Sequence, residues 1–471
     1  MFSLARRLLV QSSSNRKLLL STMSSGSINK RPVNATIPAK VGDLLSEVDT
    51  PSLVVNKAAL ERNLLRMRDY VASVNTDHRR VLFRPHTKTH KCPALAKLQI
   101  ELGGATGVCC QKLDEVEAML DGGVMDVFLT NQCVGARKIT RLCELAQRRG
   151  AKLSVLVDDL DNTRDLARHA QDAGIHLDVL IEVNGGQDRC GLNIDSDGGP
   201  SLAVQLAQEV RASGPALTFK GIHCYGGWLQ HVRTVAERRD KVMNGPVACA
   251  QKAVGVLQEA GVDCEIVTGA GTGSYRMETE AGVHNELQPG SYCFMDHDYG
   301  LNEDGHDVFE NALFLHATVV SKANDERRAV IDAGLKASSL DSGPPRLVSG
   351  LVSVNSGGGG DAATGVEFRT GGDEHGILVG DYCRSLRVGD TVRLVPGHID
   401  PTVNMHHFLV VVSDDDEEVR GAVKAAGEQL PCSDKGDGSD RNGGNGDSGR
   451  WGTDEPRVVA IWEVAGRSPG L

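Results

Sequence analysis

Two features that lie far apart in the sequence point to one kind of chemistry. Lys88 follows a short apolar run in Arg84-Pro-His-Thr-Lys-Thr-His-Lys91, and a lysine with a lowered pKa can form a Schiff base. In Thr268-Gly-Ala-Gly-Thr-Gly-Ser274, glycines allow backbone N–H groups to approach an anion, and Thr272 and Ser274 can donate hydroxyl hydrogen bonds. Each feature alone is weak evidence for a functional site, because solvated lysines and ordinary tight turns are common. Together they suggest pyridoxal phosphate, whose aldehyde needs a lysine and whose phosphate needs a cradle.

A histidine and an aspartate in the C-terminal part of the chain could bind a metal ion. They occur in Pro396-Gly-His-Ile-Asp-Pro-Thr402, where His398 and Asp400 project the same way if the segment is extended. One nitrogen and one carboxylate ligand suit a divalent ion of the Mn, Mg, Co or Zn type, and two ligands do not choose among them. A turn with a surface histidine is the alternative.

The fold that would position these residues is indicated by short apolar runs that alternate with helical patterns between Val81 and Asp296. Eight strand candidates begin at Val81, Gly107, Val124, Leu153, Leu177, Leu217, Cys264 and Glu286. The helical patterns include Leu113–Leu120, Ala136–Arg148, Leu160–Ala173, Leu202–Ala212 and Arg238–Ala260. This alternation predicts an α/β fold with parallel strands and crossover helices, and eight units indicate a TIM-type (β/α)8 barrel. An open doubly wound sheet is the alternative.

Several polar side chains fall where the predicted barrel strands end, which is where barrels of this type carry their catalytic residues. Gln111 ends the second strand, Arg189 follows the fifth and Tyr225 ends the sixth. The glycine-rich segment follows the seventh strand, and barrels often bind a phosphate after strands seven and eight. We therefore expect these residues and Lys88 at one mouth of the barrel.

A second, mostly β C-terminal domain is indicated from about Leu301. Strand-like runs lie there among turns without a long helical pattern: Ala312–Val320, Arg328–Ile331, Thr391–Val395 and His407–Val412. The run before the barrel, Asp49–Val55, can pair with them, and the chain ends with a further strand-like run from Arg457 to Val464. We assign residues 60–300 to the barrel, and residues 43–59 with 301–471 to the β domain.

Composition excludes several other classes of protein. The 471 residues carry a formal net charge of −11, so a nucleic-acid surface is not expected. No stretch approaches the roughly 20 continuous apolar residues that span a bilayer, so no membrane association is expected. The 12 cysteines form no C-x-x-C pair and are scattered through apolar segments, as reduced buried thiols are.

Two segments have the composition of disordered chain. Residues 1–42 contain no Asp or Glu, are basic and rich in serine, and are typical of a transit peptide for a mitochondrial matrix or chloroplast stroma. A disordered tail without an address, and a cytoplasmic protein, are the alternatives. Between Ser413 and Glu455 there are 12 acidic and 5 basic residues, and we expect an acidic, glycine-rich disordered insertion over residues 433–453.

Six motifs in order make the chain resemble a known family. They are Asp49-Thr-Pro-Ser-Leu-Val-Val55, Arg84–Lys91, Asp188-Arg-Cys-Gly191, Gly269–Ser274, Leu287-Gln-Pro-Gly-Ser-Tyr292 and Pro396–Thr402. This set resembles the D-threonine aldolase and D-serine dehydratase group, pyridoxal-phosphate enzymes of the alanine-racemase-like fold. The resemblance covers about residues 48–412 and the final strand, and six ordered motifs are far more specific than any one.

The resemblance implies a role for each matching residue. Lys88 matches the Schiff-base lysine, and His398 and Asp400 match the metal pair. His231 matches a histidine near the β-hydroxyl of the substrate, although an ordinary exposed residue is the alternative for it. The positions that match the cofactor pocket are Gln111, Arg189, Tyr225, Gly271, Thr272 and Gly273.

The resemblance also implies an activity. A D-3-hydroxy amino acid such as D-threonine would be cleaved to glycine and an aldehyde, with pyridoxal 5'-phosphate and a divalent metal. The dehydratase branch has a cysteine where this chain has Asp400, and a carboxylate favours harder ions such as Mn or Mg. A D-serine or D-threonine dehydratase is the alternative, followed by an amino-acid racemase and a cofactor-binding protein without turnover. By resemblance alone, the chain is expected to form a homodimer.

Overall fold

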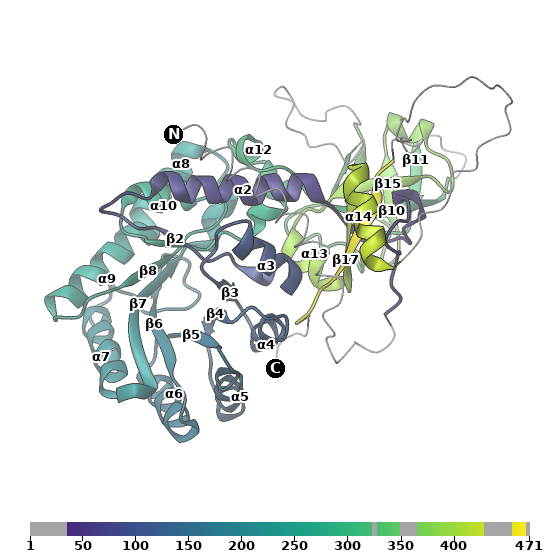
Figure 1. The fold of residues 1–471 in the computed structure, drawn as a ribbon. Helices are drawn as coiled ribbons and strands as arrows, with labels where there is room; N and C mark the ends of the chain where they lie inside the picture. Colours follow the sequence, from purple (N-terminus) through teal and green to yellow (C-terminus); the bar gives the residue numbers. More distant parts are fainter. Residues whose placement is uncertain (1–34, 323–326, 349–364, 428–454, 468–471) are drawn as a thin grey trace, which may run out of the picture.

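The computed structural model describes residues 35–322, 327–348, 365–427 and 455–467. These residues form a barrel domain and a β domain, which lie side by side (Figure 1). Helix α2 (Lys57–Val74) runs along the top of the barrel toward the β domain. No helix in these ranges is both long and apolar enough to cross a membrane.

Eight parallel strands form the barrel sheet in the order β2-β9-β8-β7-β6-β5-β4-β3. An isolated parallel bridge between His86 and Cys109, together with a 2.9 Å hydrogen bond from the Cys109 N–H to the Pro85 carbonyl, joins the two ends of this sheet. The predicted (β/α)8 barrel is therefore confirmed. Its strands are β2 (Leu82–Phe83), β3 (Val108–Cys110), β4 (Asp126–Gln132), β5 (Lys152–Val157), β6 (Leu177–Asn184), β7 (Leu217–Tyr225), β8 (Ile266–Gly269) and β9 (Glu286–Leu287).

Helices cover the outside of the barrel. They are α2, α3 (Pro93–Glu101), α4 (Leu113–Asp121), α5 (Ala136–Ala146), α6 (Leu160–Ala173), α7 (Gly199–Ala212), α8 (Val235–Val242), α9 (Ala248–Glu259) and α10 (Tyr275–Ala281). Helix α6 shows why such segments form helices: the Asp159 side chain caps its first turn, and Gly174 ends it in the left-handed conformation. The helical pattern predicted over Arg238–Ala260 is found as two helices, because η5 (Met243–Val247), with non-helical Gly245 before Pro246, separates α8 from α9.

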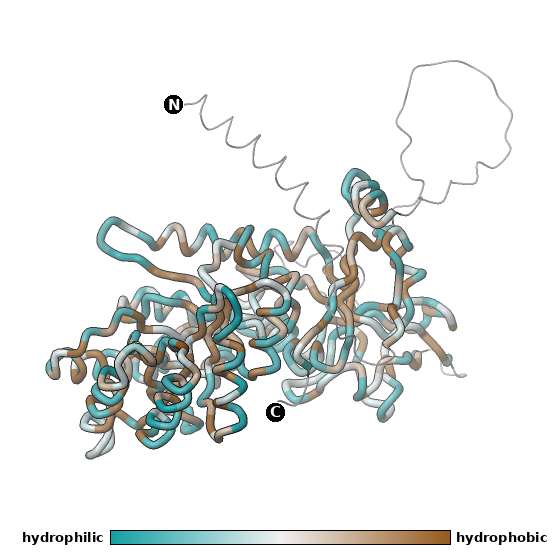
Figure 2. The backbone as a smooth tube through the Cα atoms, turned by 60° about the horizontal axis from the view of Figure 1, so that its bottom comes forward, coloured by the Kyte–Doolittle hydropathy of each residue, from teal (hydrophilic) through white to brown (hydrophobic). Residues whose placement is uncertain are grey.

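Apolar side chains of the strands and of the inner helix faces form the core of the barrel. Figure 2 shows these apolar segments gathered inside both domains, with hydrophilic segments outside. Within the ring of strands, Cys109, Phe128, Leu156 and Leu180 form a separate small cluster. This packed interior closes the barrel beneath its mouth, so that a ligand pocket can lie only above it.

The β domain is a nine-stranded sheet with the path β13-β14-β11-β10-β1-β16-β17, and β15 pairs with β10 and β12. Strand β1 (Ser52–Asn56) comes from before the barrel and lies between β10, which is antiparallel, and β16, which is parallel. The other strands are β10 (Leu313–Ser321), β11 (Arg328–Ile331), β12 (Arg346–Val348), β13 (Glu367–Thr370), β14 (Gly376–Val379), β15 (Thr391–Val395), β16 (Phe408–Ser413) and β17 (Arg457–Glu463). The predicted pairing of the run before the barrel with the C-terminal strands is thus found.

Helices also occur after residue 301, contrary to the expectation from the sequence. Helix α13 (Ile399–Met405) follows β15, and α14 (Asp416–Ala426) is capped by the Asp415 side chain at the start of the acidic stretch. The predicted insertion at 433–453 lies outside the described residues. Short helices complete the fold: η1 (Leu45–Glu47), η2 (Thr87–Thr89), η3 (Gly214–Ala216), η4 (Gly227–His231), η6 (Ser291–Cys293), α11 (His297–Gly300), α12 (Gly305–Val308) and η7 (Asp381–Ser385).

Residues 35–42, which the sequence placed in the leader, lie against the β domain. Ala39 is buried there, and the N–H of Gly42 donates to the carbonyl of Val458 at 2.8 Å. The remainder of the predicted leader, residues 1–34, lies outside the described residues.

Candidate active site

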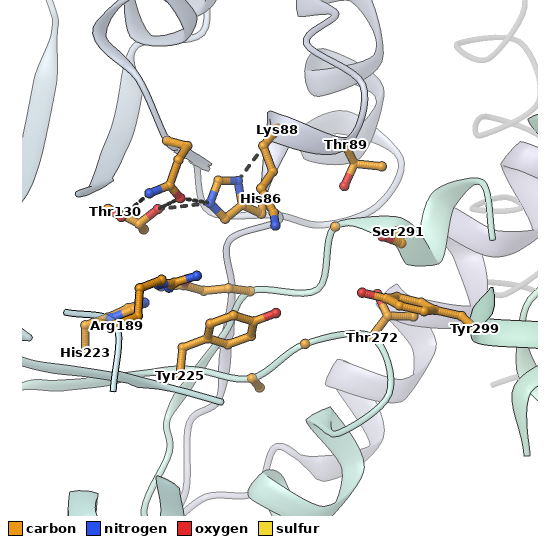
Figure 3. A pocket seen from close by; sticks show the side chains of 15 residues that line it. His86, Lys88, Thr89, Thr130, Arg189, His223, Tyr225, Thr272, Ser291 and Tyr299 are labelled. Carbon is orange, nitrogen blue, oxygen red and sulfur yellow. Dashed lines mark hydrogen bonds between the residues drawn. The ribbon is translucent and has the colours of Figure 1, made fainter. Parts of the chain in front are cut away.

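A pocket of about 520 Å3, counting the part open to solvent, lies at the carboxyl ends of the barrel strands. Figure 3 shows side chains from opposite sides of the barrel mouth pointing into it. Its lining residues are His86, Lys88, Thr89, Gln111, Thr130, Arg189, His223, Tyr225, Ala270, Gly271, Thr272, Gln288, Gly290, Ser291 and Tyr299. The pocket therefore brings together six residues that the sequence assigned to the cofactor: Lys88, Gln111, Arg189, Tyr225, Gly271 and Thr272.

Lys88 lies in η2, directly after β2, and its amine points into the pocket (Figure 3). Its Nζ atom is 3.3 Å from Oδ2 of Asp400, which comes from α13 of the β domain. The negative charge of Asp400 raises the pKa of Lys88. Burial acts to raise the pKa of Asp400, but the charges of Lys88 and His398 outweigh it and lower that pKa. The candidate Schiff-base lysine and a candidate metal ligand thus meet at one point.

His86 is hydrogen-bonded to the turn that carries Lys88. Its Nε2 lies 2.9 Å from Thr130 Oγ1 and 3.3 Å from Gln111 Oε1, and its Nδ1 accepts the backbone N–H of Lys88 at 3.3 Å. Burial holds the pKa of His86 well below its ordinary value, so the ring is neutral. A neutral ring can accept the Lys88 N–H at one nitrogen and donate from the other. Gln111 is therefore linked to the turn that carries the lysine.

Arg189 and Tyr225 form the opposite wall of the pocket. The Arg189 guanidinium lies 6.0 Å from the centre of the Tyr225 ring, within reach of a cation–π contact. Beside them, His223 Nδ1 is 3.7 Å from Glu182 Oε1, and burial lowers the pKa of His223 to about 4. The wall therefore offers a fixed positive charge, a phenol and a neutral imidazole.

The glycine-rich loop lies at the pocket, but two of its amides point away from it. The N–H of Gly271 donates to Ser274 Oγ at 3.1 Å, and the N–H of Gly273 donates to Gln230 Oε1 at 2.6 Å. Gly273 is not among the lining residues, whereas Gly271 and Thr272 are. Among the hydrogen bonds of the described residues, none uses the Thr272 hydroxyl. Within the loop, that hydroxyl remains available for an anion, whereas the Ser274 hydroxyl does not.

The predicted metal pair lies in a helical turn and not in an extended segment. His398 is the residue before α13, and Asp400 lies in the first turn, where Pro401 is tolerated and an acidic residue favours the helix dipole. His398 Nδ1 is 2.7 Å from Asp341 Oδ2, which leaves Nε2 for a metal ion. Oδ1 of Asp400 is buried and accepts no hydrogen bond from the residues that the structure describes.

Both ligands therefore fit a divalent ion. A carboxylate oxygen without a partner and an imidazole held by a second carboxylate are the arrangement expected of metal ligands. In the described part of the chain no cluster of three or more His, Cys, Asp or Glu side chains is arranged to hold a metal. His398 and Asp400 would thus leave the remaining coordination positions of an ion to water and substrate.

His231 lies beside the pocket and does not line it. It ends η4, and its ring centre is 6.0 Å from that of Tyr299, which does line the pocket. His231 Nδ1 is 2.6 Å from Asp298 Oδ2, and this hydrogen bond raises the pKa of the histidine. Arg233 binds the same carboxylate. Nε2 of His231 is left free to exchange a proton at the edge of the pocket.

Several lining residues were not found by sequence reasoning. His86, Gln288 and Ser291 lie in motifs that were noticed, but nothing in their spacing indicated that they face the pocket. Tyr299, in the short helix α11, also lines the pocket, and Asp341, which lies outside the pocket lining, contacts His398; both follow the last barrel strand, where the sequence carries no signal of position.

The residues present also fit pyridoxal phosphate. The pocket places a lysine amine, a tyrosine ring and a hydroxyl-bearing glycine loop around one space. A Cβ atom at Gly271 would approach Gln230 Cδ to 2.5 Å, so this loop needs a residue without a side chain to keep its shape.

Comparisons with known proteins agree with this geometry. The family model for the alanine racemase N-terminal domain matches residues 55–298, and the one described as "Putative serine dehydratase domain" matches residues 312–412. The chain is 41% identical over 379 residues to D-threonine aldolase of Arthrobacter sp., covering 80% of this chain and 92% of that protein. It is 41% identical over 401 residues to 3-hydroxy-D-aspartate aldolase of Paracoccus denitrificans (strain Pd 1222), covering 84% and 96%.

A solved structure shows the same arrangement of both domains. The crystal structure of D-threonine aldolase from Filomicrobium marinum matches with a TM-score of 0.74 at 36% identity, covering 92% of this chain and 99% of that one. Barrel, β domain and lysine-bearing pocket thus define a lyase of the alanine-racemase-like fold. Within this class, the chain belongs to the D-threonine aldolase family.

Proposed function

We propose that this protein cleaves D-3-hydroxy amino acids, with D-threonine and 3-hydroxy-D-aspartate as candidate substrates, to glycine and an aldehyde. The proposal includes pyridoxal 5'-phosphate and a divalent metal, with Mn or Mg as the metals that an imidazole–carboxylate pair supports. The observation that carries it is the 3.3 Å approach of Lys88 Nζ to Asp400 Oδ2. The group that would anchor an aldehyde cofactor thus lies next to a group that would hold a Lewis acid.

The cofactor, when bound, supplies an electron sink for the electrons of the broken Cα–Cβ bond. A divalent ion supplies a Lewis acid that lowers the pKa of a substrate hydroxyl. Lys88 would anchor the cofactor, with Arg189 and Tyr225 on the facing wall and the Thr272 hydroxyl at the phosphate. His398 and Asp400 would hold the ion. Because Lys88 comes from the barrel and His398 and Asp400 come from the β domain, a bound substrate would lie between groups of both domains.

His231 is the candidate proton acceptor for the β-hydroxyl. Its pKa is raised by Asp298, which makes the imidazole a stronger base and fixes the tautomer with Nε2 free. A base beside the hydroxyl favours cleavage of Cα–Cβ, because removing the hydroxyl proton drives formation of the aldehyde. Dehydration would instead need the hydroxyl to leave.

The test is product identification with D-threonine, added cofactor and purified chain, with and without EDTA. We expect glycine and acetaldehyde, loss of activity with EDTA, and recovery with Mn or Mg. L-Threonine is the matched control and should give no aldehyde. Ammonia and 2-oxobutyrate would instead identify a dehydratase, the alternative suggested by the family match over residues 312–412.

Two further proposals concern assembly and location. We propose a homodimer, to be tested by light scattering of the purified chain at micromolar concentration. We also propose that residues 1–34, with the basic and acid-poor composition of a transit peptide, direct the chain to a mitochondrial matrix or chloroplast stroma. A fluorescent fusion of the full chain that remains in the cytoplasm would contradict the second proposal.

A further inference from the structure

Beneath the glycine-rich loop, buried polar side chains form a chain of hydrogen bonds that ends at a carboxyl group. Ser274, Gln230 and Glu278 are each no more than 1% exposed. Ser274 Oγ accepts the N–H of Gly271 at 3.1 Å and Nε2 of Gln230 at 3.0 Å. A hydroxyl oxygen has two acceptor lone pairs and one proton, so Ser274 has only its proton left to give. It donates this proton to Glu278 Oε2 at 2.8 Å.

Glu278 therefore fixes the direction of the Ser274 hydroxyl. Through Ser274 it also fixes the Gly271 amide and the Gln230 side chain, which in turn holds the Gly273 amide. Both glycines belong to the loop at the pocket, and Gly271 lines it. The shape of the predicted phosphate cradle thus depends on a carboxyl group that does not itself face the pocket.

Among the described residues, Glu278 forms no ion pair. Helix α10, which carries it, packs on α8 and η5, and η5 has no ionisable side chain. The charged groups of α8 are engaged elsewhere: Arg238 pairs with Asp304, Arg239 with Glu280, Lys241 with Glu237, and Asp240 binds Asn244. On β7, burial raises the pKa values of the Cys224 thiol and the Tyr225 hydroxyl, so both are neutral neighbours of Glu278.

A buried carboxyl group without a cation favours its uncharged form. Burial raises the pKa of Glu278 to about 8. Oε2 accepts from Ser274, and Oε1 is buried without a hydrogen-bond partner, so Oε1 is the oxygen that can carry the proton. A neutral carboxyl beneath the loop is compatible with a phosphate above it, whereas a carboxylate would repel that phosphate.

We propose that Glu278 is a positioning residue of the phosphate cradle: its uncharged carboxyl group orients Ser274 and through it the loop, and a negative charge on this group weakens phosphate binding. This inference rests on the proposed function in taking the phosphate of pyridoxal phosphate as the anion. The direction of the pH dependence follows from the charges. The affinity for phosphate is highest while Glu278 is neutral, and it falls as the pH rises through about 8, the pKa of Glu278. Because the Glu278 carboxyl group lies behind the loop that would hold the phosphate, a unit negative charge on it is expected to lower the affinity for phosphate by about tenfold or more.

The experiment measures the affinity of the full chain, freed of cofactor, for pyridoxine 5'-phosphate between pH 7 and 9.5. This probe lacks the aldehyde, so Lys88 forms no covalent bond to it, and its phosphate is fully charged throughout. In the wild type we expect affinity to fall by about tenfold or more over this range. Glu278→Gln keeps an acceptor for the Ser274 hydroxyl and cannot ionise, so it should keep the affinity at pH 7 and lose the alkaline decline.

Two variants serve as controls. Glu280→Gln removes an exposed carboxylate two residues further along the same helix and should behave as the wild type. Ser274→Ala should weaken binding several-fold already at pH 7, because the Gly271 amide loses its acceptor. Parallel declines in the wild type and in Glu278→Gln, or unchanged binding in Ser274→Ala, would overturn the proposal. A wild type that binds at pH 7 while giving no aldehyde from D-threonine would contradict only the proposed function.

Discussion

Lys88 and the two side chains of the metal pair carry most of the chemistry proposed for this protein. The lysine and the His-x-Asp pair were identified from residue type and spacing, because an amine after a strand and two ligands two positions apart are local features. Their meeting was not predictable from spacing, since it depends on how the β domain packs on the barrel. His231 shows the opposite case: it was identified by resemblance, but its partner Asp298 comes from the four-residue helix α11, for which the sequence carried no signal.

Lys88→Ala should abolish the visible absorption of bound cofactor and lower aldolase activity by at least about a thousandfold, because no other lysine lines the described pocket. The measurement is an absorption spectrum after dialysis, together with kcat/KM for D-threonine. Lys91→Ala is the matched control: Lys91 pairs with Glu115 and Asn404 outside the pocket, and its loss should leave the band in place. A band that survives in Lys88→Ala would show that another group anchors the cofactor.

Asp400→Asn should keep the cofactor absorption and weaken metal binding by at least about 100-fold, because a carboxylate ligand is lost. Asp341→Asn should weaken it less, by about 10-fold, since Asp341 only orients His398. Metal affinity of the cofactor-loaded enzyme, measured by calorimetric titration with Mn, distinguishes the two. Equal Mn affinities in the wild type, Asp400→Asn and Asp341→Asn would show that the metal binds elsewhere.

Asp298→Asn should shift the acid limb of kcat/KM to lower pH. Asp298 raises the pKa of His231, and a base works only when unprotonated, so activity in the wild type should fall as the pH drops through a value above 6.5. Replacing the Asp298 carboxylate with an amide removes this increase in the pKa of His231. The pH profile of kcat/KM for D-threonine tests this, and His231→Gln should remove the limb altogether. An unmoved limb in Asp298→Asn would mean that another group titrates there.

At the scale of elements, the eight barrel strands were predictable because each is a short apolar run bounded by turn residues. The direction in which the N–H groups of the glycine-rich loop point was not predictable. Gly271 and Gly273 were expected to turn their N–H groups toward a phosphate, but Ser274 and Gln230 accept them from behind. Gln230 lies in η4, in a different part of the sequence, so only the folded structure shows the competition. Likewise, the sequence did not show that the segment of the metal pair starts helix α13, whereas the shared direction of His398 and Asp400 was argued for an extended segment.

The loop should tolerate a side chain at one glycine better than at another. In Gly271→Ala the new Cβ would lie 2.5 Å from Gln230 Cδ, whereas in Gly273→Ala it would lie 3.2 Å from Gln230 Oε1. Overpacking of this kind costs about 1–3 kcal/mol, so we expect cofactor affinity to fall by about tenfold or more in Gly271→Ala and clearly less in Gly273→Ala. A fluorescence titration with the cofactor measures both. Gly198→Ala, with open space around the new atom, is the control.

At the scale of the whole molecule, a few buried polar residues join the two domains. Asn63 of α2 is fully buried, and its Nδ2 donates to the carbonyls of Cys293 at 3.1 Å and Glu310 at 2.8 Å. Its Oδ1 accepts the N–H of Glu310 at 2.8 Å. Because α2 and Cys293 belong to the barrel side and Glu310 leads into β10, this side chain contributes to holding the two domains together.

Asn63→Ala should destabilise the folded protein by about 2–4 kcal/mol, because three buried hydrogen bonds to backbone groups would be lost. Thermal unfolding of the cofactor-loaded enzyme measures this effect as a lower Tm. Asp69→Ala on the same helix removes an exposed side chain that pairs only with Arg68, and should change stability by less than about 0.5 kcal/mol. A similar Tm for both variants would show that Asn63 does not join the domains.

Strand β1 has a consequence for the way the protein is made. It lies between β10 and β16 in the finished sheet, yet it leaves the ribosome long before either of them. At ~5–20 residues per second, synthesis takes roughly 20–70 s to proceed from β1 to the end of β16. For roughly 6–23 s of that time, while the chain grows from Leu287 at the end of β9 to Asp400, all the barrel strands and Lys88 have been made but the carboxylate that will face Lys88 has not. The barrel residues of the cofactor pocket are therefore translated before the two metal-ligand candidates, in an order set by the direction of translation.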